Sequence, residues 1–164
     1  MIFILLLFLS VAGASPLTTI AETSQFKKTG RYDEVIRLCH EFQAKYPLQV
    51  LCAEFGRTPE GRSMKAMIVS GAAHLRAKQA HAAGDTIVYF QGGIHAGEID
   101  GKDAGFWWLK NALKDKSDLL KRVTIIFVPV FNVDGHERFG KNNRPNQIGP
   151  EEMGWRSTAW NLNL

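Results

Sequence analysis

Residues 86 to 98, Thr-Ile-Val-Tyr-Phe-Gln-Gly-Gly-Ile-His-Ala-Gly-Glu, decide the fold. Residues 86–90 are a continuous run of β-branched and aromatic side chains, typical of a strand buried on both faces, and two glycines end it. Residues 102–116 then have apolar side chains at helical spacing, and residues 123–131 form a second run typical of a fully buried strand. Strand, helix and strand in this order predict a right-handed βαβ unit and a partly parallel sheet.

The helix over residues 102–116 contains two adjacent tryptophans. Its spacing predicts that Ala104, Leu109 and either Trp107 or Trp108 face inward. A platform for carbohydrate or aromatic ligands is the alternative for the tryptophans, but helical spacing favours core packing.

The first half of the chain predicts a helix followed by antiparallel edge strands. Residues 32–46 have the periodicity of an amphipathic helix that ends before Pro47. Residues 49–55 and 63–69 are predicted strands, and the Pro and Gly between them favour a hairpin turn. Residues 72–85 suit an exposed loop or a short helix. The fold class expected is therefore α/β, with a mixed sheet flanked by helices.

Composition indicates one globular domain. The chain has 164 residues, of which 45% are hydrophobic and 22% charged, so wholesale disorder is excluded. The net charge of +4 is spread over scattered lysines and arginines, which argues against a nucleic-acid-binding face.

The N-terminus has the pattern of an export signal. Residues 2–9 are an unbroken apolar run, too short for a transmembrane helix, and the following Ala-x-Ala predicts cleavage after Ala14. No Lys or Arg precedes this run, which is unusual for a signal peptide. We expect residues 1–14 to be a signal peptide, residues 15–30 a loose segment, and the protein to be secreted or periplasmic.

The two cysteines, Cys39 and Cys52, fit an oxidising compartment. A disulfide between the predicted helix and the predicted strand would contribute about 3 kcal/mol. Two small buried thiols explain the same residues nearly as well.

The chemical signal is His95 with Glu98 three residues later, beyond the carboxyl end of a predicted strand. Ligands bind at this end of the strands in open α/β sheets. Imidazole nitrogen and carboxylate oxygen are normal zinc ligands, and a catalytic zinc takes three protein ligands and a water. A histidine that simply hydrogen-bonds a neighbouring carboxylate is the non-functional alternative.

Two further motifs fall near the same edge of the sheet. Residues 131–135, Phe-Asn-Val-Asp-Gly, follow the second predicted strand, although Asn-x-Asp-Gly is also ordinary turn chemistry. Arg156 lies in the irregular segment 138–164, where its guanidinium could polarise a carbonyl if it turned back over the sheet.

In this order, three motifs resemble the zinc carboxypeptidases of the M14 (carboxypeptidase A-like) family: residues 93–98, residues 132–135 and residues 155–156. Flanking residues 99–105 and 143–146 are similar to its bacterial secreted branch. The resemblance covers about residues 32–164 and implies the family's carboxypeptidase-like phosphorylase/hydrolase architecture, truncated here. Residues 31–164 would be the N-terminal part of the catalytic domain.

The resemblance implies Zn²⁺ as cofactor, with His95 and Glu98 as its first two ligands. It implies that Arg156 stabilises the negative charge developing on the scissile carbonyl oxygen. The implied activity is release of C-terminal amino acids from peptide or protein substrates by a monomeric metallocarboxypeptidase, without membrane insertion.

The chain also departs from this family. Digestive members carry an arginine between the two ligands, where this chain has Ala96-Gly97. The third ligand, the general base and the carboxylate-binding Asn-Arg pair are expected after Leu164. The chain itself is therefore expected to be an incomplete and inactive portion.

None of the other histidines is well placed to serve as a ligand: His40, His74, His81 and His136. Two other functions stay open. One is an amidase or deacylase of the same scaffold, acting on cell-wall peptides or acylated amino acids. The other is a non-catalytic binding protein.

Overall fold

The computed structural model describes residues 17–164, so the predicted signal peptide lies outside the described residues. The elements in chain order are α1 (Ile20–Thr23), α2 (Tyr32–Lys45), β1 (Val50–Arg57), β2 (Ser63–Val69), α3 (Ala77–Ala83), β3 (Thr86–Gln91), α4 (Asp100–Lys114), a 3₁₀ turn (Asp118–Lys121), β4 (Val123–Val128), α5 (Val133–Glu137), β5 (Gly140–Lys141) and β6 (Glu152–Met153). The predicted helices, hairpin and βαβ order are confirmed.

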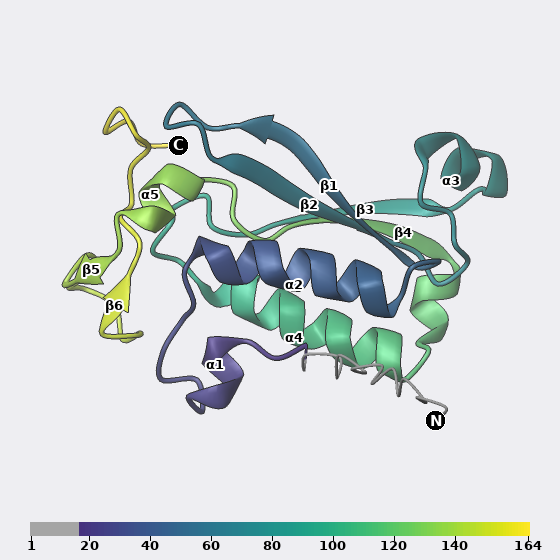
Figure 1. Ribbon diagram of the computed structural model, residues 1–164, viewed down its shortest axis with the longest axis horizontal. Coiled ribbons are helices and arrows are strands. Elements are labelled where there is room, and N and C mark those ends of the chain that lie inside the picture. Colours follow the sequence, from purple (N-terminus) through teal and green to yellow (C-terminus); the bar gives the residue numbers. More distant parts are fainter. Residues whose placement is uncertain (1–16) are drawn as a thin grey trace, which may run out of the picture.

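The central sheet has the strand order β1-β2-β4-β3 and is mixed, as predicted. β1 and β2 form an antiparallel hairpin, and β2 also pairs with β4 in antiparallel orientation. β3 and β4 are parallel, and Thr86 to Gln91 pair with Val123 to Val128 without a shift. Both parallel strands therefore end at the same edge of the sheet, where Figure 1 places α5 and the C-terminal segment.

The core lies between this sheet and the two long helices, α2 and α4, which cover the same face (Figure 1). Phe106 of α4 connects the layers, since its ring stacks on Phe42 of α2 at 6.1 Å and meets Phe127 of β4 edge-on at 5.4 Å. Such aromatic pairs stabilise a core beyond the area they bury.

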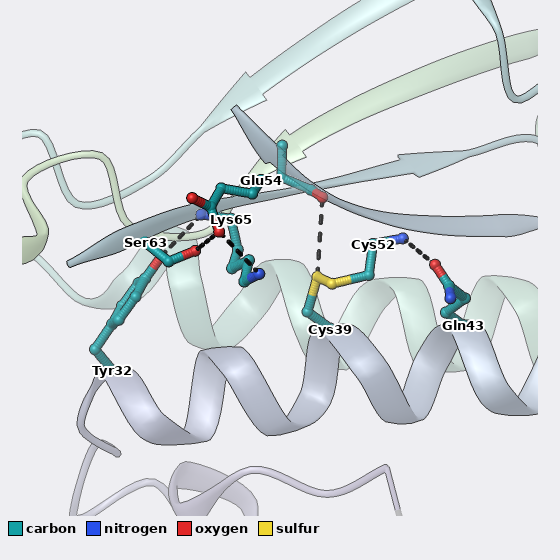
Figure 2. The surroundings of a disulfide bond; sticks show 8 residues. Tyr32, Cys39, Gln43, Cys52, Glu54, Ser63 and Lys65 are labelled. Carbon is teal, nitrogen blue, oxygen red and sulfur yellow. Dashed lines mark hydrogen bonds and ion pairs between the residues drawn. A yellow bond between two sulfur atoms is a disulfide. The ribbon is translucent and has the colours of Figure 1, made fainter. Parts of the chain in front are cut away.

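The disulfide alternative for Cys39 and Cys52 is correct: the bond joins α2 to β1. Figure 2 shows that it lies within a row of contacts between helix and hairpin. The backbone N–H of Cys52 donates to Oε1 of Gln43 at 2.8 Å, and that of Lys65 donates to the Tyr32 hydroxyl at 2.9 Å. The helix and the hairpin are therefore held together at several points along their length.

The expectation that β3 is buried on both faces is wrong. Ile87, Val88, Tyr89 and Phe90 are between 38% and 57% exposed, whereas β4 is almost entirely buried. The reason is position, because within residues 17–164 β3 is an edge strand whose only partner is β4. An apolar run predicts a strand, but burial requires neighbours on both sides and cover on both faces.

The inward face of α4 also differs from the prediction. Leu109 is buried as expected, but Trp107 is 48% and Trp108 38% exposed, and Ala104 is exposed. The buried stripe instead runs through Phe106, Leu109 and Leu113, at spacings of three and four residues. The tryptophans fall on the flank of this stripe, so their prediction as core residues is wrong.

The predicted loose segment, residues 15–30, is ordered where it is described. Thr19 caps α1 with a reciprocal capping box to Glu22, which satisfies backbone donors at the helix start. Leu17, Thr19 and Ala21 are buried. Short polar stretches carry little periodicity, which is why the sequence pattern missed this turn.

Candidate metal centre

The site is built where β3 and β4 end. Pairing continues beyond the strands, because Gly92 N–H donates to the Val128 carbonyl at 2.8 Å and Asn132 N–H donates to the Gly93 carbonyl at 2.9 Å. Gly93 has a φ of 57°, and a Cβ there would come within 3.2 Å of Val130. This backbone turn therefore requires glycine, and it delivers the following residues to the sheet edge.

His95 and Glu98 face one another across the turn. Their closest atoms, Nδ1 of His95 and Oε1 of Glu98, are 3.1 Å apart, and Glu98 N–H closes the turn onto the His95 carbonyl at 2.8 Å. Nε2 of His95 is buried and has no hydrogen-bond partner within residues 17–164. Imidazole and carboxylate thus converge through Nδ1, whereas Nε2 points away from Glu98.

A third side chain, Arg144, completes this cluster. Its NH2 group donates to Oε1 of Glu98 at 2.9 Å, and its side chain is only 8% exposed. NH1 of Arg144 is buried without a hydrogen-bond partner among the described residues. Sequence reasoning missed this contact, because Arg144 lies 46 residues from Glu98 and only the tertiary structure brings them together.

The electrostatics favour an ionised Glu98. Burial raises the pKa of its carboxyl, but hydrogen bonds from Arg144 and His95 and their charges outweigh it and lower the pKa below the ordinary value. Glu98 is therefore a carboxylate at neutral pH, the form that binds metal ions.

The motif at residues 132–135 forms the helix start beside the site. Oδ1 of Asn132 caps α5 by accepting from Gly135 N–H at 3.0 Å. The buried carboxylate of Asp134 accepts from the hydroxyl of Thr58 at 2.7 Å and from Arg62 at 2.6 Å, both in the hairpin turn. These residues hold the hairpin turn and α5 together, a structural role.

Arg156 is brought to the same edge of the sheet by its backbone. Nδ2 of Asn132 donates to the Arg156 carbonyl at 3.2 Å, and Trp155 N–H donates to the Gly135 carbonyl at 2.7 Å. The Arg156 side chain is exposed, and its Nε donates to Oδ1 of Asn163 at 2.8 Å. Within the described part of the chain, its guanidinium has no recorded contact with His95 or Glu98.

His136 lies buried behind the loop that carries His95 and Glu98. Nδ1 is 3.2 Å from the Ala96 carbonyl, Nε2 is 3.2 Å from the Gly30 carbonyl, and the residue is 1% exposed. Burial, aided by the charge of Lys102, lowers the pKa of this imidazole. A neutral His136 donates one proton to one of the two carbonyls, and it connects the loop to the start of α2.

The residues present fit a zinc ion in part. Nδ1 of His95 and the ionised Glu98 carboxylate, which face one another, are two candidate ligands, whereas a catalytic zinc takes three protein ligands. Between Leu17 and Leu164, no three His, Cys, Asp or Glu side chains lie close enough together to hold a metal ion. The described residues therefore form a pair of candidate ligands rather than a complete metal site.

Comparison with known proteins agrees with this fold and its motifs. The family model of the zinc carboxypeptidases (Peptidase M14) matches residues 35–163, and the chain belongs to this family. A curated relative, the inactive metallocarboxypeptidase ECM14 of Saccharomyces cerevisiae, is 31% identical over 124 residues, or 68% of this chain. The chain spans 28% of the length of that relative.

Two solved structures share the fold. Carboxypeptidase A from Helicoverpa armigera is 27% identical with a TM-score of 0.58, and the match covers 69% of this chain and 27% of that one. Bovine thrombin-activatable fibrinolysis inhibitor, in complex with tick carboxypeptidase inhibitor, is 20% identical with a TM-score of 0.57, covering 70% and 34%. The predicted mixed α/β carboxypeptidase-like fold is confirmed, and this chain is shorter than either structure.

Proposed function

We propose that this chain is part of a zinc-dependent metallocarboxypeptidase that releases C-terminal amino acids from peptides. The observation that carries the proposal is the pairing of His95 Nδ1 with the Glu98 carboxylate, 3.1 Å apart, at the edge where two parallel strands end. The family match, which spans both residues, supports the same assignment.

In this proposal His95 and Glu98 hold the zinc ion, together with a third ligand outside the chain. When bound, zinc supplies a Lewis acid that polarises the scissile carbonyl and activates water. Asn132 holds the backbone of Arg156, and the exposed side chain bonds Asn163, which a substrate carbonyl could replace as its partner. Arg156 would then meet the developing negative charge. The chain alone, without a general base, would be inactive.

We further propose that the protein is exported and acts as a monomer. The apolar run and Ala-x-Ala site at residues 1–14 support export, and so does the disulfide, because disulfides persist in oxidising compartments. No helix in the described part of the chain is long and apolar enough to span a membrane. Mass spectrometry of the N-terminus of the exported protein tests the signal, with Ser15 as the expected first residue.

The test of function uses the full-length protein. We expect it to bind one zinc ion and to cleave a blocked dipeptide with a free C-terminal carboxylate, but not the matching C-terminal amide. His95→Ala and Glu98→Ala should abolish hydrolysis and weaken zinc binding at least about tenfold, because losing a direct ligand costs no less than losing a hydrogen-bond partner of a ligand. His74→Ala is the matched control, because His74 pairs with Asp85 away from the site. The 164-residue chain should show weak zinc binding and negligible turnover.

The non-catalytic alternative has one observation in its favour, since a curated relative is described as inactive. Zinc binding by the full-length protein with no hydrolysis of peptides, cell-wall peptides or acylated amino acids would favour this alternative. Cleavage of an acylated amino acid but not of the dipeptide would favour the deacylase.

A further inference from the structure

We propose that Arg144 is a positioning residue of the candidate zinc site: it holds the Glu98 carboxylate toward His95 and so strengthens zinc binding. This inference rests on the proposed function, because it takes His95 and Glu98 as ligands. The structure offers a direct contact for it, and nothing in the family match assigns a role to Arg144.

The contact is specific to one carboxylate oxygen. Oε1 of Glu98 accepts from NH2 of Arg144 at 2.9 Å and faces Nδ1 of His95 at 3.1 Å. The Glu98 side chain is 43% exposed, so without this hydrogen bond it is free to turn into water. Arg144 is 8% exposed and cannot follow it. The buried arginine therefore selects the orientation in which the carboxylate and the imidazole converge.

The backbone around Arg144 is arranged to hold this geometry. A Cβ on Gly97, between the two ligands, would lie 2.8 Å from Cγ of Arg144 and 2.7 Å from the Gly154 carbonyl oxygen. Only glycine at this position lets the arginine stem pass across the ligand turn. The neighbouring Asn143 fixes the loop, because its Nδ2 donates to the carbonyls of Arg138 at 2.8 Å and Met153 at 2.7 Å.

The positive charge of Arg144 repels a metal ion, whereas its hydrogen bond to Glu98 favours metal binding by orienting the carboxylate. Hydrogen bonds to metal ligands typically change metal affinity about 10- to 100-fold. The repulsion is reduced because Glu98 already partly neutralises the guanidinium. We therefore expect the orienting effect to prevail, and lysine, which keeps the charge but not the planar fork, to replace arginine poorly.

The experiment measures zinc affinity by calorimetry with a competing chelator, in the full-length protein. Arg144→Met, which keeps the length and apolar stem, should weaken zinc binding about tenfold or more, and Arg144→Lys should also weaken it. The control is Arg37→Met, which removes an exposed arginine paired with Glu41 on α2 and should leave the affinity unchanged. With Co²⁺ in place of zinc, the visible absorption band should shift in Arg144→Met but not in Arg37→Met.

A double-mutant cycle separates positioning from a general structural effect. If Arg144 acts through Glu98, Arg144→Met should lose no further zinc affinity in a Glu98→Ala background, because no carboxylate remains there to be oriented. Thermal melts without metal confirm folding, and Arg144→Lys carries the test if Arg144→Met does not fold. Equal or tighter zinc binding by Arg144→Met, or an equal loss in both backgrounds, overturns the inference alone. Absence of zinc binding by the unaltered protein overturns the proposed function, and the inference with it.

Discussion

β3 and β4 are parallel neighbours with similar apolar sequences, yet their surroundings differ completely. β4 lies between β2 and β3, and all its residues but one are buried. In the described part of the chain β3 has β4 as its only strand partner, and its first five residues are exposed. Phe127 of β4 and Phe90 of β3 stack at 5.0 Å, but Phe127 is 0% and Phe90 38% exposed. Similar sequences therefore predict the same element but not the same contribution to stability.

The same contrast continues into the histidines that follow the two strands. His95, after β3, keeps a side chain that is 21% exposed and a buried nitrogen without a partner. His136, after β4, is enclosed between two carbonyls. The exposed strand β3 therefore leads into the candidate metal site. The buried strand β4 leads to His136, which supports the loop of that site from behind.

The largest expected effect separates the two strands directly. Phe127→Ala should lower the free energy of unfolding by about 3–5 kcal/mol, because it empties a fully buried aromatic site. Phe90→Ala on β3 is the matched change, and its cost should be smaller because the side chain is 38% exposed. Urea denaturation measures both. Equal costs would show that β3 is buried in solution.

The second prediction compares the two sheet edges. β1 is the other edge strand of the sheet, and the disulfide between Cys39 and Cys52 bonds it to α2. None of the residues of β3 is a cysteine. Replacing Cys39 and Cys52 together by alanine should cost about 2–4 kcal/mol, by relaxing a constraint on the unfolded chain. The same denaturation experiment, with and without reductant, checks it. Reductant should destabilise the unaltered protein and leave the double variant unchanged.

The third prediction concerns the enclosed histidine. Because burial lowers the pKa of His136 below its ordinary 6.5, the unfolded chain takes up a proton at a higher pH than the folded chain. Its contribution to stability should be complete above pH 6.5 and decline as pH falls below it, by at most about 1.4 kcal/mol per pH unit. Unfolding free energies of the unaltered protein and of His136→Gln, measured between about pH 5 and 8, should diverge in slope below this point. Parallel slopes would contradict the prediction.

The smallest expected effect on stability is at the exposed edge. Ile87→Lys on β3 should change the free energy of unfolding by less than about 0.5 kcal/mol but reduce self-association, because a lysine on an edge strand opposes strand pairing between molecules. Light scattering at increasing concentration measures the association. Ile125→Lys, the matched change in buried β4, should prevent folding.

Sequence patterns predicted most of the elements correctly. The amphipathic spacing of α2, the turn residues of the hairpin and the strand-helix-strand order each depend on neighbouring residues, so they can be read locally. The errors were in burial. Trp107 and Trp108 have helical spacing that fits either face of α4, and only the packing of Phe106 against α2 and β4 decides which face points inward.

The candidate site divides in the same way. The sequence by itself determined that His95 and Glu98 lie within one turn after a strand. They are only three positions apart, so the chain keeps their backbones close together whatever the rest of the fold does. Only the tertiary structure decided that β3 is an edge, that Arg144 bonds Glu98, and that His136 supports the loop from behind. Those contacts join residues about 40 or more positions apart. They depend on strand order and loop path, which no local spacing encodes.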